Sequence, residues 1–585
     1  MISALPPLAV AVPILVASAL LAFGHFLPRR AADVVAILCA LGIAVLGGVM
    51  AAQAMDGSLL HWFGGWSTRG DVVLGIAFSA DLAGSVMVAL LGLLFAASLL
   101  FAWGFFEEVG VQFHVLMLVF LAAMAGFSLT RDLFNLFVWF EVMSVAAFAL
   151  TAYRLEASSL EGALNFTVTN ALGAIMMLAG IGLLYGRLGS LDMPTLGERA
   201  AAAGGDPVLL AAFCLLAVAL LIKGATVPFH FWLPDAHAVA PSPVSMIFSG
   251  AMVAMGIFGL SRLTWNIFAH AGTVADQAHG VLLWLGAIST VVGGMVALAQ
   301  RHLKRMLAFS TISHTGILLM GLATLRPDGL AGLLTYLVGH GLVKAALFAL
   351  SGVLMATLGG IDEIGLRGRG RDIWPVGLAF ALGGLLLAGA PIGLMDEGVK
   401  LLDAAASAGG TAWVAVLALP VGAGLTGGAV LRVTGRVFLG WGEVSGEEER
   451  APSEEESEQA NRPLWLMLLP VAVLLLLALT TGDFVARFAR HAAGAMMSAA
   501  GQGPPAVPDA PAHSWLPWAG LALAILVAVW DLGKRHLPRL LDGSVDALTA
   551  PVSIGLDRLH SGLIGDEVAW ILLGLALLAL RLAYG

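Results

Sequence analysis

Long uninterrupted runs of apolar residues recur along nearly the whole chain, and they constrain its fold more than any other feature. Hydrophobic residues occupy 59% of the 585 positions and charged residues only 11%, whereas a soluble domain carries roughly 25% charged residues. In hydrocarbon only helices and closed barrels satisfy every backbone polar group, and apolar runs without alternation exclude the barrel. The sequence therefore predicts an all-α polytopic membrane protein.

We expect about sixteen membrane spans, because about 20 apolar residues suffice for a helix to cross the hydrocarbon core. The predicted spans are 6–27, 32–52, 82–103, 112–130, 132–151, 162–186, 207–226, 241–265, 278–299, 303–325, 329–358, 374–403, 411–439, 463–480, 515–532 and 566–583. Basic residues gather in alternate short loops, around Arg30, Arg301, Arg369 and Arg535. Since short cytoplasmic loops carry the excess of lysine and arginine, we predict a multi-pass protein of the cytoplasmic membrane with its N-terminus outside.

Glycine and proline interrupt two of the predicted spans in corresponding ways. The seventh span ends with LLIKGATVPFHFWLPDAHAVAPSPVS, and the twelfth reads LLLAGAPIGLMDEGVKLLDAA. Such interruptions free backbone carbonyls that must find partners, and they favour a polar cavity at that depth. A matched pair of interrupted spans is typical of a transporter with an inverted repeat and a pathway near the bilayer midplane.

This pattern divides the chain into successive parts. They are N-terminal transmembrane helices in 1–130, a first inverted repeat of helices four to eight in 112–265, a second repeat of helices nine to thirteen in 278–439, an acidic cytoplasmic loop in 440–462 and C-terminal helices in 463–585. We expect the first apolar stretch to be a retained span rather than a signal peptide, because no basic residues precede it. The acidic loop should be a solvated linker. The amphipathic connector 533–565 could lie on the membrane surface or dock onto a neighbouring subunit.

Ionisable residues within the spans are the second main observation. The principal ones are Glu141, Lys223, His340, Lys344 and Lys400, accompanied by His314, Asp396 and Glu397. A charged group at the membrane centre costs at least about 2.5–3.5 kcal/mol, so these side chains should face one another or water. A Lys–Glu pair at the midplane would hold a proton when the pair is closed and release it when the carboxylate moves away. The sequence therefore predicts a chain of proton-carrying side chains.

Each of these residues also has a structural explanation that the sequence leaves open. Glu141 could be an ion-pair partner between helices, and Lys223 could cap carbonyls freed by the helix break. Lys400 could simply be neutralised by its acidic neighbours. His314 could be bonded to a backbone carbonyl. Lys304, at the basic start of the tenth span, is expected to be a topology anchor.

Metal, cofactor and nucleic-acid sites are not expected. His230, Asp235 and His237 follow the spacing H-x4-D-x-H, which matches no zinc-site pattern, so we keep them only as secondary pathway candidates. Cys39 and Cys214 form no CxxC motif. The chain has no P-loop and no dinucleotide fingerprint, so any redox reaction must come from a partner. The net charge of −9 argues against nucleic-acid binding.

Several blocks of sequence together resemble one family. KGATVPFHFWLPDAHAVAPSPVS is similar to the signature of the antiporter-like subunits shared by respiratory complex I, Mrp-type sodium/proton antiporters and energy-converting membrane hydrogenases. NLFVWFEVMS resembles the family's glutamate-bearing fifth helix, RHLKRMLAFSTISHTGIL its tenth and HGLVKAALFALSG its eleventh. The resemblance covers 75–440. It implies about fourteen core helices with two inverted five-helix repeats, followed here by about two extra C-terminal helices.

By position, the resemblance makes Glu141 and Lys223 the first-half pair, His340 and Lys344 the central relay, and Lys400 the terminal lysine of the second half. Departures from the family pattern accompany this assignment. The lysine often found in span eight is replaced by Ala254, so that relay step is missing or taken by water. The family's DLKR before span ten is HLKR here. Lys400 stands one place off a gapless match, and APSPVS leans towards the hydrogenase-type subunits.

The resemblance and the buried charges lead to one principal hypothesis. We expect a proton-translocating antiporter-like subunit that works with other membrane subunits in a complex I-like or hydrogenase-like assembly. An alternative is a subunit of an Mrp-type sodium/proton antiporter, with protons and sodium as its ions. A further alternative is a scaffold subunit whose charges no longer conduct.

Overall fold

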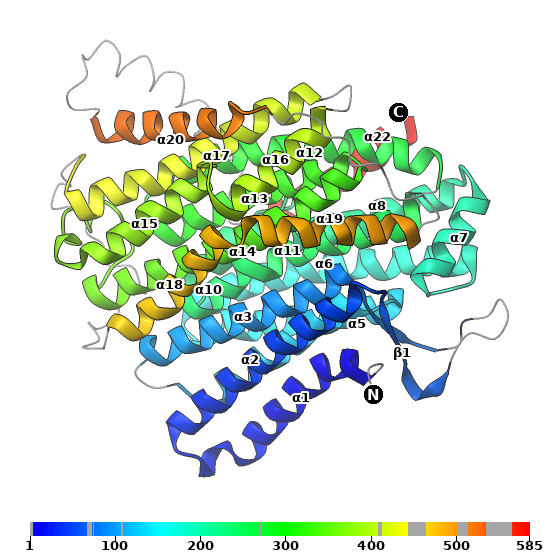
Figure 1. The fold of residues 1–585 in the computed structure, drawn as a ribbon, viewed down its shortest axis with the longest axis horizontal. Coiled ribbons are helices and arrows are strands. Elements are labelled where there is room, and N and C mark those ends of the chain that lie inside the picture. Colours follow the sequence, from blue (N-terminus) through cyan, green and yellow to red (C-terminus); the bar gives the residue numbers. More distant parts are fainter. Residues whose placement is uncertain are drawn as a thin grey trace.

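The structure, a computed structural model, describes residues 4–66, 73, 75–106, 109–269, 271–407, 412–442, 464–499, 513–533 and 564–584. Most of its helices run side by side along one direction (Figure 1). Within the described residues twelve helices are long and apolar enough to cross a membrane, or up to thirteen if one bent pair counts as a single span. The predicted all-α polytopic fold is confirmed.

The N-terminal helices and the first predicted repeat contain these elements: α1 (Leu5–Phe23), η2 (Gly24–Phe26), α2 (Arg29–Ala54), β1 (Leu59–Trp62), η3 (Phe63–Gly65), β2 (Ala77–Ala80), α3 (Leu82–Phe105), α4 (Val111–Leu129), α5 (Leu133–Thr151), α6 (Ala157–Leu188), α7 (Met193–Ala203), α8 (Pro207–Lys223), α9 (Trp232–Val239), α10 (Ser242–Ile247), η4 (Phe248–Met252), α11 (Val253–Leu263) and η5 (Thr264–Phe268). The strands β1 and β2 form an antiparallel pair.

The second predicted repeat and the C-terminal part contain these: α12 (Thr273–Ala299), α13 (Leu303–Ala323), α14 (Pro327–Leu358), η6 (Arg371–Ile373), α15 (Trp374–Leu387), α16 (Gly393–Ser407), α17 (Ala412–Thr434), η7 (Gly435–Leu439), α18 (Leu464–Thr480), α19 (Gly482–Ala499), α20 (Leu516–Gly533) and α22 (Ile564–Tyr584). Every predicted span coincides with one helix or with consecutive helices. The acidic loop 440–462 and the connector 533–565 lie almost entirely outside the described residues.

Several backbone features occur at corresponding positions in the two halves, as expected for two copies of one structural unit. The helices α6 and α14 each have 32 residues, and each ends at a left-handed glycine, Gly189 or Gly359. Shortly before each helix a leucine takes positive φ, 56° at Leu155 and 48° at Leu325. These conformations are uncommon outside glycine, so their matched occurrence supports the predicted repeat.

Isolated β-bridges mark the same correspondence. Among them, one joins Asp132 to Asp192 in the first half and another joins His302 to Asp362 in the second, with equal spacing along the chain. Asp132 and His302 also occupy the N-cap positions of α5 and α13 and accept a backbone N–H there. The boundaries 112–265 and 278–439 stay predictions.

Both predicted helix breaks are present. The seventh span stops at the end of α8 and resumes as α9, and the twelfth stops at the end of α15 and resumes as α16. In the second break Gly389 and Gly393 have φ of 78° and 75°, a left-handed conformation that only glycine adopts without strain. The first break lies beside the innermost helices, because α8 packs against α11 and α9 packs against α13. Every residue in the apolar window of α13 and of the α10–α11 segment is buried.

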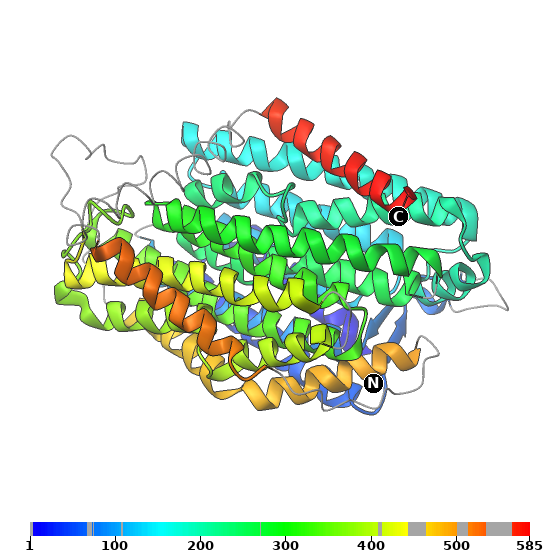
Figure 2. The same ribbon diagram turned by 90° about the horizontal axis from the view of Figure 1, so that it is seen from above.

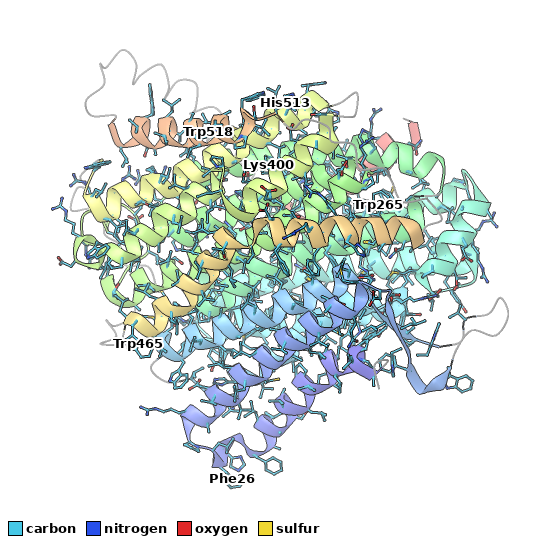
Figure 3. All side chains as sticks on the ribbon, in the orientation of Figure 1. Phe26, Trp265, Lys400, Trp465, His513 and Trp518 are labelled. Atoms are coloured by element: carbon cyan, nitrogen blue, oxygen red, sulfur yellow. The ribbon has the colours of Figure 1, made fainter. Side chains whose placement is uncertain are left out.

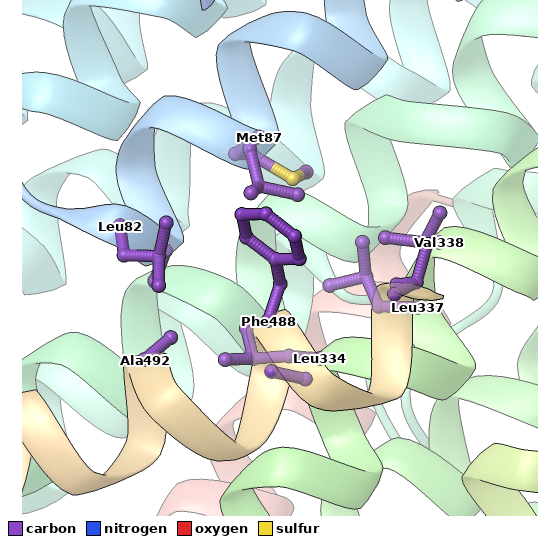
Figure 4. A pocket seen from close by; sticks show the side chains of 11 residues that line it. Leu82, Met87, Leu334, Leu337, Val338, Phe488 and Ala492 are labelled. Carbon is purple, nitrogen blue, oxygen red and sulfur yellow. The ribbon is translucent and has the colours of Figure 1, made fainter. Parts of the chain in front are cut away.

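The course that α19 takes was not indicated by the sequence. The chain bends by 68° between α18 and α19, and α19 then crosses α14 on the outside of the bundle (Figure 1). Its apolar face, including Phe488, covers a cavity of about 20 Å³ that Leu82 and Met87 of α3 and Leu334 of α14 also line (Figure 4). The space suits one water at most, so α19 is packed closely onto the core.

The C-terminal helices lie on opposite flanks of the bundle. Figure 2 shows α20 beside α17 and α22 on the other side, where it packs against α6, α8 and α12. Asp531 of α20 pairs with Arg436 at 3.1 Å. This ion pair connects α20 to the end of the second predicted repeat.

The approach of α11 to the first helix break depends on a residue without a side chain. A Cβ atom at Gly256 would overlap the backbone nitrogen of Gly224. We expect Gly256→Val to lower the thermal stability of the detergent-solubilised protein, since overpacking costs about 1–3 kcal/mol. Thermal unfolding measures this effect. Gly182→Val in α6, where an added Cβ meets nothing within 4 Å, is the control, and equal melting temperatures for the two variants would contradict the packing described.

Candidate functional site

Lys223 is the last residue of the half-helix α8 and is completely buried. Its Nζ donates a hydrogen bond to Ser144 Oγ at 2.7 Å and lies 4.5 Å from the ring centroid of Phe140, both on α5. A charged amine gains from a hydroxyl acceptor and from the face of an aromatic ring. The break in span seven thus leaves a buried lysine whose charge is stabilised by a hydroxyl and an aromatic ring.

Glu141 lies on α5, one turn before Ser144, and is only partly buried. Its carboxylate and Lys223 are near enough to interact electrostatically. Among the described residues no ion pair joins them, and the lysine bonds to Ser144 instead. This arrangement corresponds to the open state of the Lys–Glu pair considered from the sequence, and the closing of the pair stays a prediction.

Lys344 occupies the middle of α14 in the second half and is also completely buried. Its Nζ donates to the backbone oxygen of Leu307 at 2.6 Å and to Ser310 Oγ, both on α13. Phe348 presents its ring 5.8 Å away. The two lysines thus have the same kind of surroundings, namely oxygen acceptors on one side and a phenyl ring on another.

Two histidines of the second half, His340 and His314, lie near Lys344. His340 lies one turn before Lys344, is buried, and has no hydrogen-bond partner on either ring nitrogen in the described part of the chain. Its ring centroid is 5.3 Å from that of His314. His314 lies 2.6 Å from the hydroxyl of Tyr336 and 3.0 Å from that of Thr426. The alternative of a backbone-bonded His314 is wrong, because side-chain hydroxyls take both nitrogens.

His237 connects the two halves. It belongs to α9, is completely buried, and stacks on the ring of Phe348 at 4.4 Å. Neither of its ring nitrogens has a hydrogen-bond partner among the described residues. It interacts electrostatically with Lys344 and with Lys304. His237, which was only a secondary candidate, therefore lies near both Lys304 and Lys344.

Lys304 is a site candidate that the sequence reasoning set aside in favour of a topology anchor. Its side chain is completely buried, and its Nζ donates to the backbone oxygen of Ala240 at 3.0 Å. The expectation of an interfacial topology anchor is wrong, because the Lys304 side chain points into the bundle, whereas the adjacent Arg305 is partly exposed. The composition could have singled out Lys304. The chain has 29 basic residues but only five lysines, and its basic loops contain mainly arginine.

Unpaired nitrogens give this region its chemical character. A buried donor or acceptor without a partner costs about 1–3 kcal/mol, and His237 and His340 each contribute two such atoms. A neutral imidazole accepts a proton on one nitrogen and gives one from the other. Side chains of this kind, placed between amines, can pass protons in steps.

Lys400 has a different setting from that of the other pathway lysines. It lies within α16, after the second break, and its side chain is 46% exposed on the face shown in Figure 3. It forms ion pairs with Asp396 at 2.8 Å and Glu397 at 2.7 Å. Asp396 is buried, and its other oxygen has no hydrogen-bond partner in the described residues. These neighbours neutralise Lys400, and no described contact joins it to Lys344.

His230, Asp235 and His237 do not converge on one point through their contacts. Asp235 pairs with Arg305 at 3.1 Å, and the ring of His230 lies 4.3 Å from that of Phe231. No group of three or more His, Cys, Asp or Glu side chains in the described ranges could hold a metal ion. The absence of a metal or cofactor stays a prediction.

A polar cavity that the sequence did not indicate lies at one end of the second repeat. It has a volume of about 200 Å³ and is lined by Arg301, Glu363, Arg432, Arg436 and Asp531. Arg436 donates to Glu363 at 2.6 Å. Burial raises the pKa of the Glu363 carboxyl, whereas the two helix arginines act in the opposite direction. The cluster joins the loop after α14 to the end of α17 and to α20.

Comparison with known proteins assigns this arrangement to a family. Residues 130–421 match the family described as NADH:quinone oxidoreductase/Mrp antiporter, TM. The chain is 31% identical over 414 residues to one subunit of the NADH-quinone oxidoreductase of Desulforudis audaxviator, a match that covers 69% of this chain and 80% of that one. The chain belongs to this family.

Relatives from the antiporter branch of the family match over a similar extent. One subunit of the Na(+)/H(+) antiporter of Bacillus subtilis is 28% identical over 475 residues, which cover 78% of this chain and 90% of the relative. A chain of the Mrp complex from Dietzia sp. superposes with a TM-score of 0.75 at 25% identity, covering 85% of this chain and 99% of that one. The family resemblance noted in the sequence is confirmed.

Two further solved structures share the fold. A chain of respiratory complex I from Thermus thermophilus has a TM-score of 0.63 at 27% identity and covers 81% of this chain and 96% of its own length. A chain of the membrane-bound sulfane sulfur reductase, an archaeal respiratory membrane complex, has a TM-score of 0.74 at 21% identity over 85% of this chain and 99% of that chain. At that identity the second likeness establishes the fold alone.

The contrast in burial among the lysines can be measured directly. We expect a water-soluble acetylating reagent to modify Lys400 of the native, detergent-solubilised protein at least roughly tenfold faster than Lys223, Lys304 and Lys344, because buried amines react only after local opening. Mass spectrometry of peptides measures the rates. Denatured protein, in which all four amines are accessible, is the control. Comparable labelling of Lys344 and Lys400 in the native protein would contradict the burial described.

Proposed function

We propose that this chain moves protons across the membrane through its buried lysines and histidines, as an antiporter-like subunit. The observation that carries the proposal is the set of completely or almost completely buried Lys304, His237, Lys344, His340 and His314. Structural stabilisation alone does not account for them, because two of the imidazoles make no hydrogen bond among the described residues. Ionisable groups inside a membrane protein are functional by default.

The proposed route runs through both halves. Protons enter near Glu141 and Lys223, pass laterally by way of His237 to Lys344, and continue through His340 towards the Lys400 cluster. At each transfer an N–H or O–H bond breaks on the donor as one forms on the acceptor. Because these groups interact electrostatically, a change in the protonation of one shifts the proton affinity of the others, and the groups titrate together. The titrating pair envisaged between Glu141 and Lys223 would close only when the amine leaves Ser144.

Lys304 offers a replacement for the missing lysine of span eight. The position expected to hold that lysine is Ala254, a buried residue of α11. Lys304 places an amine near His237 from the neighbouring helix α13. We propose that it serves as the relay group there, so that water need not bridge the whole gap.

We further propose that the chain works among other membrane subunits in the cytoplasmic membrane, with its N-terminus outside. The similar solved chains come from multisubunit membrane complexes, namely an Mrp complex and respiratory complex I. Protons are the transported ions and the lipid bilayer is the surrounding medium. The alternating basic loops support the orientation.

Sodium/proton exchange in an Mrp-type assembly is the second candidate function. It is favoured by the likeness to the Na(+)/H(+) antiporter subunit of Bacillus subtilis over most of both chains. A non-conducting scaffold is the third, and Ala254 in place of a relay lysine was its main support. The buried amine of Lys304 weakens that argument.

Removing a pathway amine tests the proposal. We expect Lys223→Ala and Lys344→Ala to reduce proton transport by the complete complex in inverted membrane vesicles by at least about 10²-fold, the lower range of the contribution of a positioned proton-transfer group. A pH-sensitive fluorescent dye reports the transport. Arg187→Ala, which removes an exposed cation paired with Asp206, is the control. Full transport by both lysine variants would establish the scaffold function instead.

Sodium dependence separates the two transport functions. Proton translocation alone predicts that the initial rate of dye response stays the same when sodium is replaced by choline at constant ionic strength, because no sodium ion takes part. Sodium/proton exchange predicts that the response disappears without sodium. The Lys344→Ala vesicles provide the baseline for both conditions.

A further inference from the structure

The helix α22 lies beyond the residues that the family description matches. The match ends at residue 421, whereas α22 begins at Ile564. Figure 2 shows α22 along one flank of the bundle, where it packs against α8, α6 and α12. It therefore covers the half of the molecule that contains the break of span seven.

Contacts position α22 directly over that break. A Cβ added to Gly574 would lie 2.6 Å from the ring of Phe229 and 2.8 Å from Pro228, so the helix backbone lies against the interrupted segment. The ring of Trp570 is 6.3 Å from that of Phe231. The helix thus follows the seventh span from α9 back through its break.

The first turn of α22 buries a carboxylate there. Glu567 is only 4% exposed, and its Oε2 has no hydrogen-bond partner among the described residues. It lies near enough to Asp235 for their carboxylates to repel each other. Asp235 is itself paired with Arg305, whose side chain is 43% exposed. Glu567 is therefore a buried acid beside an ion pair that reaches solvent.

The buried carboxyl of Glu567 beside the partly buried carboxylate of Asp235 and one guanidinium favours a shared proton. An unpaired buried carboxylate is costly, and two neighbouring carboxyl groups lower this cost when one is protonated. Arg305 can stabilise whichever carboxylate carries the charge. The two carboxyl groups can therefore accept a proton from solvent and pass it inward. At each stage one carboxyl is neutral and the charge of the other is stabilised by Arg305.

We propose that Glu567 and Asp235 form a carboxyl pair that loads protons at the break of span seven, with α22 acting as the element that supplies the second acid. In each transfer the O–H bond of one carboxyl breaks as an O–H bond forms on the other. The emptied carboxylate is reloaded from a hydronium ion at the exposed side of Arg305, whose O–H bond breaks to leave water. This inference rests on the proposed proton transport and adds to it an access point outside residues 130–421, which match the family.

The test compares variants of α22 in the complete complex. We expect Glu567→Gln to lower proton transport in inverted vesicles on the order of tenfold, since a positioned acid–base group is lost while the shape of the side chain is kept. Glu567→Asp should restore at least half of the rate. Asp566→Asn is the matched control, because it removes an exposed carboxylate from the adjacent position, and it should retain the full rate. The amount of assembled complex in the membrane is measured for each variant.

A second variant moves the helix rather than the acid. Gly574→Val should reduce transport as Glu567→Gln does, because its side chain collides with Phe229 and displaces α22. Full transport by Glu567→Gln, together with loss of transport in Lys223→Ala, would overturn the carboxyl pair and leave the proposed function standing. Equal losses in Glu567→Gln and Glu567→Asp would also overturn it, since they indicate a structural role. Full transport by Lys223→Ala would instead refute the proposed function itself.

Discussion

A cation inside a membrane protein must be solvated by the protein itself, and the arrangement of the central helices follows from this constraint. Lys223, Lys304 and Lys344 are each completely buried. Each has an oxygen acceptor supplied by another segment: a serine of α5, a carbonyl next to α9, or a carbonyl and a serine of α13. The helix breaks matter because they place chain ends and free carbonyls at the depth where amines need partners.

The two halves have corresponding backbones but carry different polar side chains at equivalent positions. Counted from the matched bridges, Ser144 in the first half and His314 in the second occupy equivalent positions. The same correspondence sets Asn170 of α6 against His340 of α14. The first half thus has neutral polar groups where the second has imidazoles. A hydroxyl or amide solvates a neighbouring lysine, whereas an imidazole can also carry a proton, so the titratable side chains concentrate in the second half and at its junction with α9.

Much of the fold followed from the sequence because bilayer thickness fixes helix length. All the predicted spans lie on helices, and the glycines and prolines located both breaks. The path of α19 was not predicted, because an amphipathic segment of this kind is equally compatible with a membrane surface. Its docking onto α3 and α14 depends on contacts between residues far apart in the chain.

The site was predicted less completely than the fold, because the sequence does not show which way a side chain turns. Lys223, Lys344 and His340 lie in the interior as expected. Lys304 was assigned to the interface because basic residues surround it, yet the burial of α13 takes it inside. Lys400 was placed in the pathway by its resemblance to the family, yet its side chain is half exposed and neutralised by the acids of its own helix.

The crossing of α19 over α3 and α14 has a mechanical consequence. It is laid obliquely over helices from the N-terminal part and from the second repeat, with Phe488 seated between them (Figure 4). Sliding of these helices past one another would pull the ring from its seat and bring apolar surface into contact with lipid or water. A transport cycle that keeps this ring in place must therefore proceed without sliding of α14 against α3, for example by reorientation of side chains within the helices.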